Sequence, residues 1–445
     1  MVKIRFIAAA FGASMGMFSL GTYVGWASPT IPKLLKDNSP IKLNPDEASL
    51  AISLLKAGNA LGCIISIFLV DFIGRKGTII ISIIPTTIGW IIILFAKSAM
   101  TLYIARIVGG ISNGLSATTV PMYLAEISPA SIRGTVESCA ILLMYGAIIF
   151  AYGIGPFIDI RQFAGISIAI SLFHFFFFIW FPETPYYLIK CKNEGTARKT
   201  LNLLRKNSIS EEIESIKRTV GNEEKWNIQE IFSNSKNMKK LMLGVGVMLI
   251  TVTCGEILLL NNSEILFNSI EGKLLDGKYA SMILAGVLVI VSLIFFSLVD
   301  YIGRKLLLIS SSFGVIIFSI LVGGYFYFQE SGYNIYHLSW IPTFGILLII
   351  ASTSIGATAI PYVVVSEIFP MKLKAIYSGI SMCLTFFSAF IALEIFSLII
   401  NHVNIYTAFF LLAAINNVNV LFIYFYLPET KRKTLEEIQM NNITH

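Results

Sequence analysis

The chain has 445 residues, of which 56% are hydrophobic and only 13% are charged, and its formal net charge is +7. Soluble domains carry roughly 25% charged residues, so this composition excludes a water-soluble globular protein and indicates a chain that lies mostly in lipid. The cations stand in short connectors between apolar runs, which excludes a continuous basic surface for nucleic acid.

Twelve apolar runs are long enough to cross the hydrocarbon core of a bilayer, which takes about 20 helical residues. Six precede the polar interval Pro182–Lys239 and six follow it. In chain order they are Phe6–Ala27, Ala48–Val70, Gly77–Phe95, Leu102–Leu124, Ser138–Gly155, Phe163–Phe181, Lys240–Leu260, Tyr279–Val299, Leu306–Phe328, Ile341–Val365, Tyr377–Ile400 and Thr407–Leu427. The sequence therefore predicts an all-α membrane protein with twelve transmembrane helices.

The cations favour one orientation in the membrane. Alternate connectors carry Arg75-Lys76, Arg133, Arg304-Lys305 and Lys374, on the same side as Lys3, Arg5 and the tail. The opposite connectors are poorer in cations, although Ser28–Glu47 contains three lysines. Because cytoplasmic connectors are enriched in Lys and Arg, we predict that both termini are cytoplasmic.

No enzymatic site can be found in the sequence. The interval Pro182–Lys239 has mixed charges and helical periodicity, which indicates short amphipathic helices on the cytoplasmic surface. Its 58 residues are too few for an ordinary enzymatic core, and it lacks a Gly-rich phosphate loop and a His/Cys cluster. The five cysteines have neither disulfide nor metal-site spacing. We expect no catalysis, no metal and no cofactor.

Three motifs occur twice in the same order. "DFIGRK" at Asp71–Lys76 returns as "DYIGRK" at Asp300–Lys305, and "PET" closes each half at 182–184 and 428–430. Glu126 is followed by Pro129 and Arg133, as Glu367 is followed by Pro370 and Lys374. The repeats predict two pseudo-symmetric six-helix bundles at 1–181 and 240–427, a cytoplasmic linker at 182–239 and a tail at 428–445. Parallel repeats are typical of carriers whose substrate site lies between the halves.

These motifs, together with "PMYLAEISPASIRG", "FPETP", "IPYVVVSEIFP" and "LPETKRKTLEEI", resemble the sugar porters of the major facilitator superfamily. The stretch "GTYVGWASPTIPKL" that begins at Gly21 is similar to the first helix of insect facilitated trehalose transporters. The resemblance covers essentially the whole chain. It implies a facilitative carrier of trehalose or a hexose that works by alternating access, as a monomer, in the cell membrane.

The repeated charges are the candidate gating residues. Gly74 and Gly303 permit a tight reversal, and the acids at the span ends can stabilise helix N-termini. The resemblance implies ion pairs that latch the cytoplasmic ends, with Glu126 and Glu367 as acidic partners; the alternative is that the charges only set topology. The set comprises Asp71, Arg75, Glu126, Arg133, Asp300, Arg304, Glu367 and Lys374.

The expected sugar site departs from the family pattern. In register with Gly255, Thr251 and Val252 stand where sugar porters place glutamines, and Tyr362 stands for a tryptophan. Tyr23 stands where proton symporters place an aspartate, which favours facilitated diffusion. Polar residues that could compensate are Asn113, Thr118, Tyr145, Thr251, Glu256, Asn261, Asn262, Thr358, Tyr362 and Thr385. Helix packing is the alternative role for each of them, and a solute sensor or a carrier of a less polar solute remain alternative functions.

One prediction concerns three charges within the predicted spans: Lys56, Glu256 and Glu394. Intramembrane charges are costly and usually face a partner or a wet cavity. Counting the helical rise places all three in the outer half of the membrane. We expect a Lys56–Glu394 pair that joins the outer ends in inward-facing states, with Glu256 free for solute or as the alternative partner of Lys56.

Overall fold

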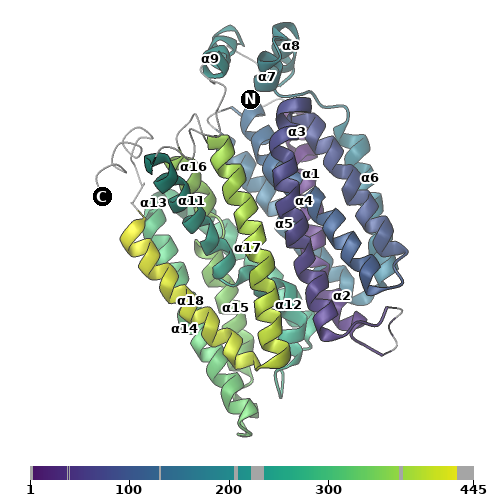
Figure 1. Cartoon of the computed structure of the whole chain (residues 1–445), viewed down its shortest axis with the longest axis vertical. Helices are drawn as coiled ribbons and strands as arrows, with labels where there is room; N and C mark the ends of the chain where they lie inside the picture. Colours follow the sequence, from purple (N-terminus) through teal and green to yellow (C-terminus); the bar gives the residue numbers. More distant parts are fainter. Residues whose placement is uncertain are drawn as a thin grey trace.

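The computed structural model describes residues 4–37, 39, 41–129, 132–204, 209–221, 235–369 and 374–427, and it leaves out a few side chains within the helices. The described residues form helices and connectors only. Figure 1 shows two groups of long helices side by side, α1 to α6 in one and α11 to α18 in the other, with α7, α8 and α9 gathered at one end.

The first group contains the helices of the N-terminal half. Its elements are α1 (Ile4–Gly25), α2 (Ala27–Leu34), α3 (Pro45–Leu94), α4 (Ala99–Ile127), α5 (Arg133–Ile154) and α6 (Ile160–Phe178). Their starts are set by local capping, since an oxygen at the N-cap satisfies a free backbone N–H. Asn44 and Glu47 form a capping box at the start of α3, and Asp159 and Gln162 form one at α6.

The second group contains the helices of the C-terminal half. Its elements are α11 (Ser235–Thr253), α12 (Glu256–Asn268), α13 (Gly277–Ile302), α14 (Arg304–Glu330), α15 (Trp340–Ile355), α16 (Ile360–Ile368), α17 (Lys374–His402) and α18 (Ile405–Tyr426). Ten helices or helix pairs are long and apolar enough to cross a membrane by length and composition. The two arms of α3 count as one of these ten, and α4 is more polar. When the second arm of α3 and α4 are added to these ten, the total agrees with the twelve predicted spans.

Two predicted spans are broken. The seventh run is divided at Gly255, whose φ of 94° separates α11 from α12, and the tenth is divided between α15 and α16. The sequence predicted each as one continuous helix, because both halves of each run are equally apolar. Broken helices at membrane depth occur where protein or a cavity can satisfy the exposed backbone groups.

Both copies of the repeated motif turn at their glycine. Gly74 has φ 84° and Gly303 has φ 109°, a region that residues with a side chain rarely adopt. The turn at Gly74 divides α3 into its two arms, and the turn at Gly303 separates α13 from α14. The predicted tight reversals are thus confirmed in both halves.

The described part of the central interval forms three short helices. They are α7 (Pro185–Lys190), α8 (Glu194–Leu204) and α9 (Ile209–Gly221), as its amphipathic pattern predicts. Leu201, Ile213 and Ile216 are buried between them. The Glu194 carboxylate pairs with Lys217 at 2.6 Å, and hydrogen bonds from Lys217 and Arg198 hold the pKa of that carboxyl below its ordinary value.

Helices α3 and α4 approach so closely that their glycines meet. A Cβ placed on Gly114 would collide with the Asn59 carbonyl oxygen, and one on Gly110 with that of Leu55. Small residues at such crossings let backbones approach, which is how membrane helices gain dispersion energy in the absence of a hydrophobic drive. This close crossing fixes the first arm of α3, which carries Lys56.

We predict that Gly114→Ala lowers the thermal melting temperature of the purified protein by several degrees, because the two backbones must separate. The matched control is Gly146→Ala in α5, where an added Cβ meets nothing within 4 Å. That change should leave the melting temperature unchanged or raise it slightly, since Ala is the better helix former by about 1 kcal/mol. Equal melting of both variants would contradict the close-packing account.

Candidate functional site

A buried arginine ties together the helices that surround the centre of the first bundle. Arg106 of α4 is fully buried and donates to the carbonyl oxygens of Ala51 at 2.9 Å and Tyr23 at 2.8 Å. Its guanidinium lies over the Trp26 ring, 4.9 Å from the centroid. The Tyr23 hydroxyl donates to the Thr86 carbonyl oxygen at 2.8 Å. The position expected of a proton-coupling aspartate is therefore a buried, hydrogen-bonded phenol.

Lys56 and Glu394 do not pair as predicted. The Glu394 carboxylate accepts a hydrogen bond from Ser53, one turn before Lys56. The Lys56 ammonium lies 5.9 Å from the centroid of the Phe386 ring and interacts electrostatically with Glu256. Glu256, its alternative partner, is the acid whose charge acts on Lys56. The helical rise does not give the direction of a side chain around the axis of α3, and this direction decides which acid Lys56 approaches.

The Glu256 carboxylate is buried without a hydrogen bond or an ion pair to any other described residue. It is 8% exposed, and the group of opposite charge that acts on it is Lys56 of the other bundle. Glu256 is the first residue of α12, where the helix dipole favours an acid. The helix N-terminus offsets part of the cost of burying this acid, and the carboxylate oxygens stay available to a ligand.

Three further predicted residues gather around Glu256. The hydroxyl of Tyr145, on α5, faces Thr358 across the interface between bundles, and both Tyr145 and Tyr362 interact electrostatically with Glu256. Tyr362 keeps 42% of its surface exposed, although it lies near the fully buried Cys63 and Cys254. An exposed side chain among buried neighbours indicates accessible space between the bundles. We define Lys56, Tyr145, Glu256, Thr358 and Tyr362 as the central site.

The other predicted polar residues mostly bond to their own helices. Thr118, Thr251, Asn261, Asn262 and Thr385 each donate to a carbonyl oxygen three or four residues earlier. Asn261 and Asn262 are at most 7% exposed. Asn113 differs, because its buried Nδ2 has no hydrogen-bond partner among the described residues. In the present conformation the side chains of this group therefore bond within their own helices, and Asn113 is the exception.

The bundles are joined at the end opposite α7–α9, here called the far end. Helix α2 packs on α12, where the hydroxyl oxygens of Ser28 and Ser263 are 2.7 Å apart. Tyr152 donates to the Leu260 carbonyl oxygen, and the His402 ring lies 2.9 Å from Asp46. Together with Ser53–Glu394, these contacts connect the far ends of both bundles.

At the end that carries α7–α9, here called the linker end, the predicted Arg75–Glu126 pair is formed. Arg75 Nη2 lies 2.8 Å from Glu126 Oε1, and both side chains are nearly buried. Arg75 also lies over the Tyr187 ring at 5.7 Å. Asp71 forms an exposed ion pair with Lys190 of α7 at 2.8 Å. The motif thus binds the reversal at Gly74 to α4 and to the linker.

Sequence reasoning missed one member of this network. Both carboxylate oxygens of Glu183, in the first "PET", accept from the Lys76 backbone N–H at 3.0 and 3.1 Å. A Cβ on Gly74 would collide with Glu183 and Tyr187, so the glycine is required sterically as well as for its φ. The recurrence of "PET" with the other motifs indicated that Glu183 has a role. The spacing of the motifs alone does not show which backbone N–H the Glu183 carboxylate binds.

The second copy of the network is described in part. The side chains of Asp300, Glu367 and Lys374 lie outside the described residues. Arg304 begins α14 directly after the turn at Gly303, in the place that Arg75 takes in the first copy. Arg133 begins α5 and is exposed. Roles in gating for these residues therefore stay predictions.

Comparison with known proteins identifies the family. The sequence profile for "Sugar (and other) transporter" matches residues 6–441. The chain belongs to this sugar transporter family. It is 31% identical to the sugar transporter ERD6-like 6 of Arabidopsis thaliana over 98% of this chain and 90% of that one. It is 28% identical to the facilitated trehalose transporter Tret1 of Bombyx mori over 97% of this chain and 86% of the relative.

Solved structures show the same fold. A partially occluded inward-open structure of the xylose transporter XylE from E. coli has a TM-score of 0.80 and 19% identity, covering 97% of this chain and all of that one. The XylE proton:xylose symporter bound to 6-bromo-6-deoxy-D-glucose has a TM-score of 0.77 and 20% identity, with 98% of each chain covered. The chain is thus a membrane-embedded, multi-pass transporter of the major facilitator fold, and the expected family and fold are confirmed.

We predict that Arg75→Ala increases the accessibility of the central site from the linker end. Removing one partner of a buried pair costs about 3–5 kcal/mol, and the part of this cost that falls only on states closed at the linker end can invert a two-state balance of a few kcal/mol. The measurement is labelling of Thr358→Cys, in a cysteine-free background, by a membrane-impermeant thiol reagent in vesicles of each orientation.

The control for this prediction is Arg198→Ala, which breaks the exposed ion pair of Arg198 with Glu194 on the same side of the protein. Exposed pairs contribute about 0–1 kcal/mol, so labelling should not change. If Arg75→Ala and Arg198→Ala label at the same rate, the motif has no role as a latch and serves topology alone.

Proposed function

We propose that the protein is a facilitative carrier of a neutral sugar, trehalose or a hexose, that works by alternating access between two six-helix bundles. The observation that carries the proposal is the central site, where an unpaired carboxylate and hydroxyl groups from both bundles adjoin accessible space. The names of the relatives support the substrate class, since they include a trehalose transporter and sugar transporters.

The central site can replace the missing glutamines by different chemistry. Sugar hydroxyls need buried partners, because an unpaired buried polar group costs about 1–3 kcal/mol. The Glu256 carboxylate can accept several hydroxyl donors through charge-assisted bonds, while Lys56 can donate to sugar oxygens. Tyr145, Thr358 and Tyr362 add hydroxyl groups and an aromatic surface. The site would therefore recognise a polyol through two opposite charges.

Two observations favour passive transport over proton symport. Tyr23 carries no carboxylate, and its hydroxyl is already bonded to the Thr86 carbonyl oxygen. Arg106 is held by the carbonyl oxygens of Ala51 and Tyr23 in place of an acid. Glu256 is the remaining candidate for proton coupling at the central site. A sensor that binds sugar without turnover is the second candidate function, which the uptake experiment below separates.

We further propose that the linker end is cytoplasmic, in the cell membrane, and that the protein functions as a monomer. The bias of cations toward the linker end supports this orientation, because cytoplasmic connectors are rich in Lys and Arg. In this orientation the joined far ends correspond to a carrier closed toward the outside.

We predict that the purified protein in liposomes equilibrates labelled trehalose or glucose down its gradient, at a rate unchanged by a protonophore. The physical reason is the phenol of Tyr23 in the place of an acid. If the protonophore abolishes uptake, the proposal of facilitated diffusion is wrong, and Glu256 becomes the candidate for proton coupling. Saturable binding without uptake would identify the sensor.

We also predict that Glu256→Gln raises the KM for sugar about tenfold. A hydrogen bond to a charged group contributes about 1.5–3 kcal/mol, against about 0.5–1.5 for a neutral one. The matched control is Glu271→Gln, which changes an exposed acid after α12 and should leave KM unaltered. If Glu256→Gln keeps the native KM, Glu256 acts only as the N-terminal acid of α12.

A further inference from the structure

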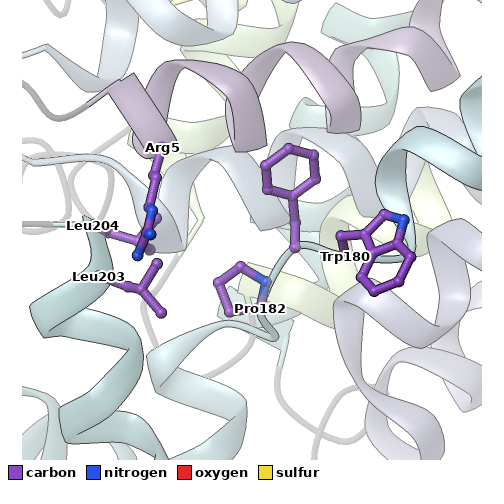
Figure 2. A pocket seen from close by; sticks show the side chains of 6 residues that line it. Arg5, Trp180, Pro182, Leu203 and Leu204 are labelled. Carbon is purple, nitrogen blue, oxygen red and sulfur yellow. The ribbon is translucent and has the colours of Figure 1, made fainter.

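A second cavity lies at the linker end, away from the central site. It has a volume of about 370 Å³ and is lined by Arg5, Trp180, Phe181, Pro182, Leu203 and Leu204. These residues come from the start of α1, the segment after α6 and the last turn of α8. Figure 2 shows Arg5 reaching from α1 toward Leu203 and Leu204, with Pro182 between these leucines and Trp180. The cavity thus has an apolar floor and a single cation.

The Arg5 guanidinium has no partner among the described residues. It is exposed, and it makes no ion pair or hydrogen bond with the described part of the chain. Its position in the first turn of α1 is unfavourable for the helix, since the N-terminal end of the dipole repels a cation. The presence of Arg5 beside an apolar cavity is therefore explained neither by the stability of α1 nor by an ion pair with a described residue.

Exposed apolar side chains lie on the two helices beside the cavity. On α1, Ile4, Ile7 and Phe11 are exposed at helical spacing and share one face. On α6 and just after it, Phe173, Phe176 and Trp180 repeat this spacing and are exposed, Trp180 by 85%. The two helices are neighbours, because the rings of Phe11 and Phe177 meet at 6.0 Å. Two adjacent apolar stripes therefore lead from the membrane interior to Arg5.

We propose that this cavity binds one anionic phospholipid of the leaflet at the linker end. The phosphate and acidic headgroup would lie at Arg5, and the acyl chains would follow the stripes of α1 and α6. Trp180 marks the interfacial depth at which aromatic side chains gather. The cytoplasmic leaflet is the anionic one, so this proposal rests on the orientation given under Proposed function. A free phosphate would leave the apolar floor and both stripes uncovered.

Binding at this cavity would tie the lipid to the gating network. Pro182 lines the cavity, and its carbonyl oxygen accepts from Tyr123 at 2.8 Å. The next residue is Glu183, which caps the reversal at Gly74. Leu204 belongs to the same buried cluster as Phe6 and Phe178, so the last turn of α8 is fixed against both helices. A bound lipid would therefore stabilise the linker against the N-terminal bundle.

The test is native mass spectrometry of the full-length protein in detergent, titrated with phosphatidylserine or phosphatidylcholine of identical acyl chains. We expect one phosphatidylserine to bind more tightly than phosphatidylcholine. Arg5→Gln should weaken that binding about fivefold, the factor equivalent to the about 1 kcal/mol that one cation contributes near an anionic lipid surface. Phosphatidylcholine binding should not change. The experiment needs neither transport nor orientation, so its failure is distinct from failure of the proposed function.

The matched control is Arg161→Gln, which removes an exposed arginine from the first turn of α6 at the far end. It should retain native binding of phosphatidylserine. A second variant, Leu203→Trp, fills the cavity floor and should abolish the tight site for both lipids while the protein still melts cooperatively. Native phosphatidylserine affinity in Arg5→Gln, or an equal loss in Arg161→Gln, would overturn the proposal. Equal affinity of the native protein for both lipids would do so as well.

Discussion

Arg106 is the charge on which the arrangement of the first bundle depends. A guanidinium at membrane depth must find oxygen partners inside the protein, since the hydrocarbon offers none. Its hydrogen bonds to the carbonyl oxygens of Tyr23 and Ala51 join α4 to α1 and α3, and Trp26 covers its face. The hydrogen bonds of Nε and Nη1 therefore link three helices and orient the first arm of α3, while the buried Nη2 has no hydrogen-bond partner among the described residues. The glycines between α3 and α4 make the required approach possible.

The position of the central site follows from that arrangement. With α3 held against α4, Lys56 faces the second bundle and interacts with Glu256 at the break between α11 and α12. The break places a helix N-terminus beside the interface, and the helix dipole there offsets part of the cost of burying Glu256. A continuous seventh helix would leave Glu256 at mid-helix with no dipole to support it. The polar site thus depends on one constrained helix pair and one interrupted helix.

The apolar runs and the repeated motifs were enough to predict the spans, the reversals at Gly74 and Gly303 and the Arg75–Glu126 pair. The break at Gly255 could not be read from the sequence, because a glycine inside an apolar run is compatible with a continuous helix. The sequence offered Glu394 and Glu256 as partners of Lys56 but could not decide between them, since helical rise gives depth but not rotation about the axis. Arg106 is visible in the sequence as a cation inside the fourth predicted span, but its partners are backbone carbonyl oxygens, which no residue pattern reveals. The sequence did not predict these contacts between helices, and they are the contacts that shape the central site.

The duplication separates what is common to both halves from what is particular to this chain. Both copies of the motif contain a glycine with positive φ that is followed by an arginine. The repetition in the sequence therefore indicates where the chain reverses. Lys56, Tyr145 and Glu256 belong to none of the repeated motifs, and they are the residues that differ most in chemistry from a neutral amide site. A carrier can change its solute by altering such unrepeated positions while the repeated ones keep the bundles moving together. The place of the site follows from the fold, whereas we propose that its choice of solute follows from Glu256 and Lys56, the two opposite charges that act on each other across the interface.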